Sequence, residues 1–213
     1  MLKIEGYSKI YDTIEDIIDP SHTALVVWDV QNMLVSRIFN REEFTGNISS
    51  VIELARRANV PIFFTRIQML PIRFESPARL YSLRRLGFDR VSQTLTKEDL
   101  DFAIKPKQLH QQEKEEQQSE IVIDKHTASI FIDTGFEHML QNAGIVTVVL
   151  TGIATEFGIE SSARDASNRG FYSVVVSDCV SSPDKEAHNR SLENMKKLIT
   201  IISSKEIENI WQK

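Results

Sequence analysis

The sequence has little cysteine and no long apolar run. Its one cysteine, Cys179, excludes an internal disulfide and a cysteine-rich metal site, and it fits a reducing compartment. No stretch approaches the roughly 18–20 consecutive apolar residues of a membrane span, and the start of the chain lacks the apolar core of a signal peptide. The formal charge of −5 gives no general reason to bind nucleic acid. We therefore expect a cytoplasmic protein that binds neither membranes nor nucleic acids.

The length of 213 residues suits one domain spanning 1–213. Short runs rich in Val and Ile recur along it, and a helical pattern follows most of them. Continuous apolar runs are typical of strands buried on both faces, and strands that alternate with helices predict an α/β fold with a mostly parallel sheet. The expected strands are 24–29, 61–65, 121–124, 146–151 and 173–178, with a weaker sixth at 198–202; the expected helices are 48–58, 135–142, 155–169 and 187–197.

The stretch between Arg66 and Glu120 does not follow this alternation. It holds prolines at 71, 77 and 106 and ends in a polar run over 107–120. Long insertions in compact domains are often functional. Two interpretations stay open: a surface helix with a solvated connector, and a lid over a pocket.

Two charged residues stand where predicted strands end. Ligands of open parallel sheets bind beyond the carboxyl ends of the strands, so polar residues there are candidates for a site. Asp29 directly follows ALVVW, where a carboxylate is costly to bury unless it is paired; it is interpreted as an acid or base, with a helix N-cap as the alternative. Lys125 ends another strand and by itself would be a surface residue. Together the two residues predict an Asp–Lys pair in a pocket.

A third feature follows the fourth strand. Thr155 suits the N-cap of a helix whose free N–H groups can bind an anion. Gly158 falls in the first turn, where glycine costs about 1 kcal/mol relative to alanine. Glycine at this place indicates either the close approach of another group or the loss of a side chain.

These three strand ends, in this order, resemble the isochorismatase-like hydrolase superfamily, which includes isochorismatases, nicotinamidases and N-carbamoyl amide hydrolases. The resemblance implies a three-layer α/β/α sandwich with a mostly parallel, Rossmann-like sheet, assembled as a homodimer or homotetramer. It places the catalytic aspartate on Asp29, the catalytic lysine on Lys125 and a cis peptide bond between Ile153 and Ala154. The matching stretches are 22–32, 121–131 and 149–178.

The chain departs from the family pattern at the nucleophile. The position of the family's cysteine falls on Gly158, so the covalent thioester route is closed there. Zinc-binding members carry Asp-x-His, whereas Gln31 stands at that place here, and we expect neither a metal nor a cofactor. Cys179 is interpreted as a small buried or loop residue rather than a substitute nucleophile.

Isochorismatases proper resemble the chain in having glycine at this position. The resemblance therefore implies a hydrolase of a small, carboxylated molecule, in which Asp29 protonates a vinyl ether and Lys125 orients Asp29. An amidase-type hydrolase of C–N bonds and a catalytically silent binding or scaffold protein stay open as alternatives. Besides Gly158 in the catalytic set, the expected substrate contacts are Gln31, Gln68 (to hold water), Arg66, Ile153 and Ala154, with Arg73 and Arg79 as further partners for a carboxylate, one arginine at most being in the pocket.

Overall fold

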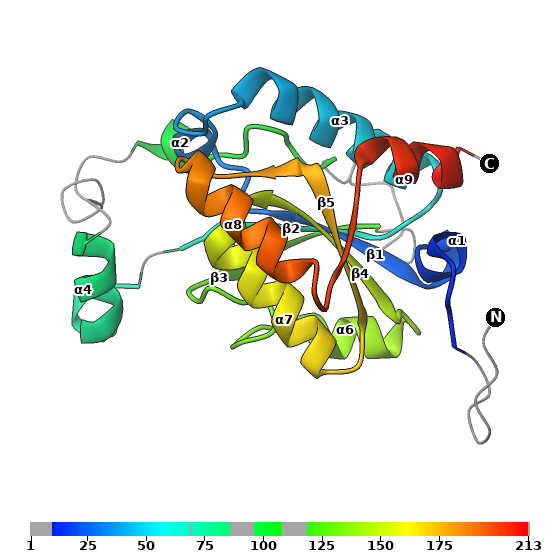
Figure 1. The fold of residues 1–213 in the computed structure, drawn as a ribbon. Coiled ribbons are helices and arrows are strands. Elements are labelled where there is room, and N and C mark those ends of the chain that lie inside the picture. The colour runs from blue at the N-terminus through cyan, green and yellow to red at the C-terminus, as the bar shows by residue number, and fades with distance from the viewer. Residues whose placement is uncertain (1–9, 69, 86–95, 108–118, 213) are drawn as a thin grey trace.

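The computed structural model describes residues 10–68, 70–85, 96–107 and 119–212. Its centre is a sheet of six parallel strands in the order β3-β2-β1-β4-β5-β6 (Figure 1). This order is that of a doubly wound, Rossmann-like sheet, as predicted. The strands are β1 (Thr23–Trp28), β2 (Ile62–Ile67), β3 (Glu120–Lys125), β4 (Thr147–Ile153), β5 (Tyr172–Ser181) and β6 (Thr200–Ile202).

The continuous apolar runs predict the central strands because these strands have no solvent-facing side. Every residue of β1 and β4 is buried. β3, at one end of the strand order, alternates between buried and exposed residues, with Val122 and Asp124 exposed. The weak sixth run is a true strand, although a shorter one than expected.

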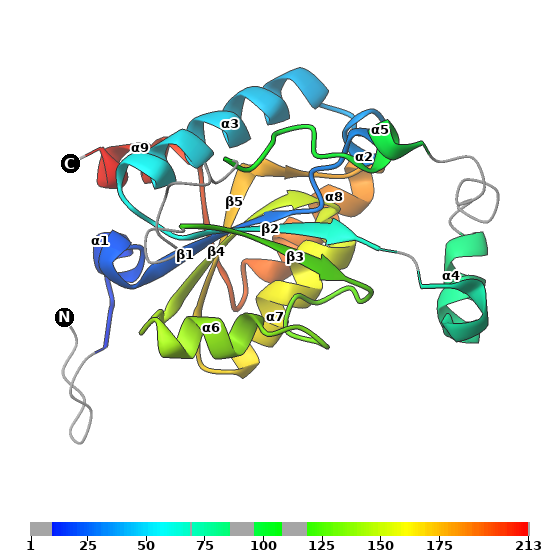
Figure 2. The ribbon, with the colours of Figure 1, turned by 180° about the vertical axis from the view of Figure 1, so that it is seen from behind.

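Helices cover both faces of the sheet, which gives the three layers that the resemblance implies (Figures 1 and 2). On one face α1 (Ile14–Ile17), α3 (Arg41–Arg57) and α9 (Ser204–Trp211) pack over a core that includes Phe44 and Trp211. On the other face α6 (Phe136–Asn142), α7 (Glu160–Asn168) and α8 (Lys185–Met195) enclose a second core.

The starts of two helices differ from the prediction by more than two residues. α3 begins at Arg41 rather than Ile48, because its first turn carries Glu42 and Glu43, which favour a helix N-terminus through the dipole rather than through an apolar pattern. The helix expected from 155 begins instead with a π-helical turn, η5 (Thr155–Ile159). Ala154 is its N-cap, so the expectation that Thr155 caps this helix is wrong.

The stretch between β2 and β3 contains short helices, of which the structure describes η2 (Ile72–Phe74), α4 (Pro77–Arg85) and α5 (Lys97–Leu100). α5 is tied to the loop after β1, where the backbone N–H of Asn32 donates to Asp101 O at 3.0 Å. α4 stands clear of the layers in both views, on the side toward which the strands point (Figures 1 and 2). Most of the polar run over 107–120 lies outside the described residues.

The remaining short helices of the described chain are η1 (Pro20–His22) and α2 (Asn32–Val35), which flank β1. Within the described residues, no helix combines the length and the apolar character needed to cross a membrane.

Candidate active site

The strand order locates the site. β1 has β2 on one side and β4 on the other, so the strand order reverses between β1 and β4. Ligands of such sheets bind beyond the carboxyl ends of the strands at this switch point. Asp29 follows β1, and the Ile153–Ala154 step follows β4. The peptide bond of that step is cis, as the resemblance implies.

Asp29 turns the chain sharply at the end of β1. Its φ of 47° lies in the left-handed region, which aspartate tolerates better than most residues. Thr65 of β2 fixes it twice: the Thr65 hydroxyl donates to Asp29 Oδ1 at 2.6 Å and accepts the Asp29 backbone N–H at 3.0 Å. α2, which follows, has Gln31 as its N-cap, so Asp29 is not a helix cap.

Lys125 reaches Asp29 across an intervening strand. β3 pairs with β2, and β2 with β1, so two interstrand spacings of about 4.8 Å separate their backbones. A lysine side chain is long enough to cross this gap, and Lys125 Nζ donates to Asp29 Oδ2 at 2.6 Å and to Thr127 O at 3.4 Å. The structure thus brings Asp29 and Lys125 into salt-bridge contact at the carboxyl edge of the sheet, and their catalytic role stays a prediction.

Burial dominates the electrostatics of this pair. Asp29 is 2% exposed and Lys125 4% exposed. Burial raises the pKa of Asp29 above its usual value, against the opposing effects of Lys125 and Thr65. Burial likewise lowers the pKa of Lys125, although the charge of Asp29 opposes this shift. The proton affinities of the two groups are thus drawn toward each other, a condition that suits a general acid or base.

The indole of Trp28 lies beside the pair. Lys125 Nζ stands over the Trp28 ring, 3.9 Å from its centroid. Two glycines border the same residue: a Cβ on Gly158 would overlap the indole, Nε1 and Cε2 first, and a Cβ on Gly152 would overlap the Trp28 backbone. Gly152 also has a φ of 119°, which only glycine adopts readily.

A match to a family model establishes which family the chain belongs to. The family model described as Isochorismatase domain matches residues 23–206. The chain belongs to the isochorismatase family. This membership places it among hydrolases.

The sequence similarity to other members of this family covers most of the chain. It is 30% identical over 190 residues to the isochorismatase family protein YecD of Escherichia coli O157:H7, covering 86% of this chain and 93% of that protein. It is 28% identical over 199 residues to the ureidoacrylate amidohydrolase RutB of Methylobacterium radiotolerans, covering 84% and 74%. A solved cysteine hydrolase from Pseudomonas syringae pv. phaseolicola has the same fold, with a TM-score of 0.76 at 18% identity over 97% and 99% of the two chains.

The Gln31 side chain of this isochorismatase-family chain is hydrogen-bonded to backbone groups of two other segments. It is fully buried, its amide donates to Leu100 O at 2.7 Å, and its carbonyl accepts the N–H of Ile67 at 3.0 Å. Gln31 thus joins the ends of β1 and β2 to the α5 segment.

Arg66 and Gln68 gather around Asp124 rather than around Asp29. Arg66 donates to both Asp124 carboxylate oxygens, at 2.7 and 3.0 Å, and Gln68 Nε2 donates to Asp124 Oδ2 at 2.6 Å. Side chains alternate along a strand, so Arg66 and Asp124 project from the opposite face of the sheet to Thr65 and Lys125. The three residues form an exposed cluster at the rim.

Of Arg66, Arg73 and Arg79, only Arg79 carries a charge that shifts the pKa of Asp29 and of Lys125. Its positive charge lowers the pKa of Asp29 and of Lys125. Arg79 lies on α4, 3.5 Å from the buried carboxylate of Glu75. The Arg73 guanidinium instead stands over the ring of Phe74, 5.8 Å from its centroid.

Cys179 is unsuited to nucleophilic work. It is fully buried in the core beneath α3 and α9, and burial raises the pKa of its thiol well above the ordinary value, with a further contribution from Asp178. Among the described residues, no group of three or more His, Cys, Asp or Glu side chains is placed to hold a metal ion.

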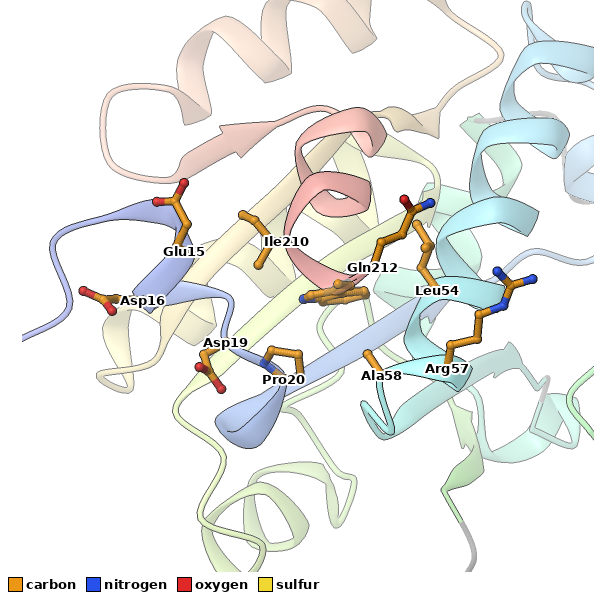
Figure 3. A pocket seen from close by; sticks show the side chains of 10 residues that line it. Glu15, Asp16, Asp19, Pro20, Leu54, Arg57, Ala58, Ile210 and Gln212 are labelled. Carbon is orange, nitrogen blue, oxygen red and sulfur yellow. The ribbon is translucent and has the colours of Figure 1, made fainter.

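A cavity of about 650 Å³ lies at the opposite end of the sheet (Figure 3). It opens beside Pro20, before β1, and Ala58, before β2, with Asp19 on one side and Arg57 on the other. Because ligands of parallel sheets bind at the carboxyl edge, this cavity is not assigned to the chemistry of Asp29.

The sequence reading missed two contributors to the site. Thr65 ends the PIFFT run, and a hydroxyl at a strand end next to a buried aspartate was a usable signal. Trp28 precedes Asp29 in an otherwise aliphatic strand, but its contact with Lys125 depends on spatial proximity that no local pattern encodes.

Proposed function

We propose that this isochorismatase-family hydrolase cleaves a small, carboxylated molecule by proton transfer at Asp29, without a covalent bond between protein and substrate. One observation carries the proposal: Asp29 and Lys125 form a buried ion pair, and the indole of Trp28 leaves no room for a side chain at Gly158, where the family resemblance puts the nucleophile. Proton transfer is the chemistry that remains available to these groups.

In this mechanism Asp29 is the general acid. Burial raises the pKa of Asp29, which favours a carboxyl that delivers its proton to a vinyl carbon of the substrate. Water then adds to the resulting cation and returns a proton to Asp29, and the hemiketal so formed breaks at its ether bond into a carbonyl compound and an alcohol. Lys125 orients the carboxylate and stabilises the charge left on Asp29 after transfer. Ile153 and Ala154, at the carboxyl end of β4, are the proposed substrate contacts on that side.

The substrate's carboxylate is proposed to meet the positive charge of Arg79, which already acts on the pair. Arginine suits this role because its fork binds a carboxylate through two hydrogen bonds. The proposed contacts of Arg66 and Gln68 lie at the rim, where Asp124 holds both side chains.

Hydrolysis of a C–N bond is the second candidate, favoured by the similarity to a ureidoacrylate amidohydrolase over most of the chain. In that reaction Asp29 would act as a base toward water, since Cys179 is buried and position 158 is glycine. A binding or scaffold role is the third. A costly buried charge pair speaks against it, because hydrophobic residues would fold as well.

The test is hydrolysis of a panel that contains isochorismate, N-carbamoyl compounds and nicotinamide by the purified protein, followed by product analysis. Release of product from isochorismate supports vinyl ether chemistry, and release from the other compounds supports C–N chemistry. With the active substrate, Asp29→Asn should lower kcat by about 100- to 10,000-fold, the range for general acid–base catalysis.

Asp133→Asn is the matched control, because Asp133 is also an aspartate with a left-handed φ, of 57°, but is exposed. Its rate should equal that of the wild type. An Asp29→Asn protein that keeps at least about a third of the wild-type rate, far above the general acid–base range, would refute the mechanism. In that case the role of Asp29 is structural.

A further inference from the structure

The indole of Trp28 contacts two parts of the site. Lys125 Nζ lies over the ring, 3.9 Å from its centroid. Gly158 of η5 lies against the same ring, where any Cβ would overlap Nε1 and Cε2. The indole therefore fills the room into which a side chain at position 158 would extend.

The contact between Lys125 and the indole has a chemical consequence. A cation over an aromatic face is attracted by the ring quadrupole, most strongly for tryptophan and for a desolvated pair. Both side chains are almost wholly buried, Trp28 at 2% exposure and Lys125 at 4%. The indole thus stabilises the ammonium form of Lys125, whereas it offers no atom that attacks a carbonyl or takes up a proton. A thiolate in the same place would do both.

We propose that Trp28 determines which reaction this site performs. Its indole closes position 158 to side chains and favours the cationic form of Lys125, which leaves Asp29 as the group that exchanges a proton with the substrate. The last part of this inference rests on the proposed function, whereas the closing of position 158 does not. Residues 28 and 158 accordingly act as one unit: a thiol at position 158 needs the indole removed.

The first test is a double-mutant cycle measured by urea unfolding. Gly158→Ala should raise the unfolding constant at least about tenfold when Trp28 is present, as overpacked cores do. In a Trp28→Leu background the same change should raise it less than about threefold, because contacting residues are non-additive. Trp28→Phe, which lacks the Nε1 atom, serves if Trp28→Leu does not fold.

Gly46→Ala is the matched control. Gly46 lies within α3, and a Cβ there meets nothing within 4 Å. Alanine should therefore be tolerated at position 46 in both backgrounds, since it is the better helix former. Equal costs of Gly158→Ala with and without the indole would overturn the claim that Trp28 fills this position.

The second test places a thiol in the opened site. The double variant Gly158→Cys, Trp28→Leu should be alkylated by iodoacetamide at least about tenfold faster than the single variant Trp28→Leu, because a neighbouring cation raises the thiolate fraction of the new thiol. The single variant is the reference, since its one thiol is the buried Cys179. The pH midpoint of alkylation should lie below that of an ordinary thiol. Adding Lys125→Met should move it back up.

Two results would refute the inference. If Gly158→Cys alone folds and reacts as fast as the double variant, the indole does not close the position. If the thiol of the double variant is unreactive, or Lys125→Met leaves its pH midpoint unchanged, Trp28 does not decide the reaction. Neither measurement uses a substrate, so a wild type that is inactive on every compound of the panel would count against the proposed function alone.

Discussion

Replacing Lys125 by methionine gives the sharpest test of the buried pair. Methionine keeps the length of the side chain but removes the charge that lies 2.6 Å from Asp29 Oδ2. At an effective dielectric constant of about 20, that attraction is on the order of 6 kcal/mol before desolvation is subtracted. The folded variant must then either hold an unpaired carboxylate or protonate it.

The cost of protonating Asp29 sets the expected loss of folding stability. Neutralising a carboxyl of ordinary pKa, about 3.9, costs about 1.4 kcal/mol for each pH unit above that value, or about 4 kcal/mol at neutral pH. This is an upper value, because burial already raises the pKa of Asp29 in the wild type. This agrees with the roughly 3–5 kcal/mol typical of breaking a buried ion pair. We therefore expect Lys125→Met to lower the free energy of unfolding by up to about 4 kcal/mol near pH 7, measured by urea denaturation.

The pH dependence shows which group is responsible. In the variant the Asp29 pKa is raised further, so the folded state binds more protons than the unfolded state between the two pKa values. The variant therefore keeps its full stability below the Asp29 pKa of the unfolded chain and loses stability as the pH rises from that pKa to the pKa of the folded chain. The deficit should shrink by roughly 1.4 kcal/mol per unit as the pH falls from about 7 toward 5.

Two comparisons complete this experiment. Adding Asp29→Asn to Lys125→Met removes both charges and should restore most of the stability, because a neutral pair needs no compensation. Lys105→Met breaks an exposed pair with Asp101, and should cost less than about 1 kcal/mol. A deficit that is the same at about pH 5 and pH 7 would refute the reasoning, because it would show that the carboxylate is hydrated or that another loss dominates.

Three other predictions follow from features outside the pair. Iodoacetamide should leave the hydrolase rate unchanged because Cys179 is buried, and a loss of rate that Cys179→Ser prevents would show that this thiol takes part. Gly152→Ala should lower the free energy of unfolding by more than about 1 kcal/mol, since it combines a positive φ with overlap of the β1 backbone, and an unchanged urea midpoint would contradict this. Ile72, Phe74 and Tyr81 are 78%, 69% and 63% exposed, so we expect them to be covered in a homodimer or homotetramer, and light scattering should show a monomer for Phe74→Glu but not for the wild type.

The parts of the fold that were predictable are those whose energetics are local. Val/Ile-rich runs marked the strands because a doubly covered sheet accepts few other residues, and charged residues directly after two of those runs marked Asp29 and Lys125. The side on which Arg66 projects depends on the first residue of β2, and a shift of one residue reverses it. α4 and α5 are short and polar, so their sequence has no strong period.

The role of Trp28 could not be predicted from the sequence, for another reason. It depends on three segments meeting at one point: the end of β1, the end of β3 and the η5 turn. A glycine at position 158 signalled a missing side chain, but only the folded chain shows what stands in its place.

Lys125 belongs to β3, which is the outermost strand on its side of the described sheet. Terminal strands of a sheet open more readily than central ones, in local fluctuations that leave the rest of the molecule folded. Each such opening would withdraw the lysine while Asp29, held by Thr65 of the inner strand β2, stays in position. The lifetime of the working pair is then set by the detachment of one strand, and hydrogen exchange of the β3 amides measures it directly. A change that tightened this edge would prolong that lifetime without altering either of the two charged residues.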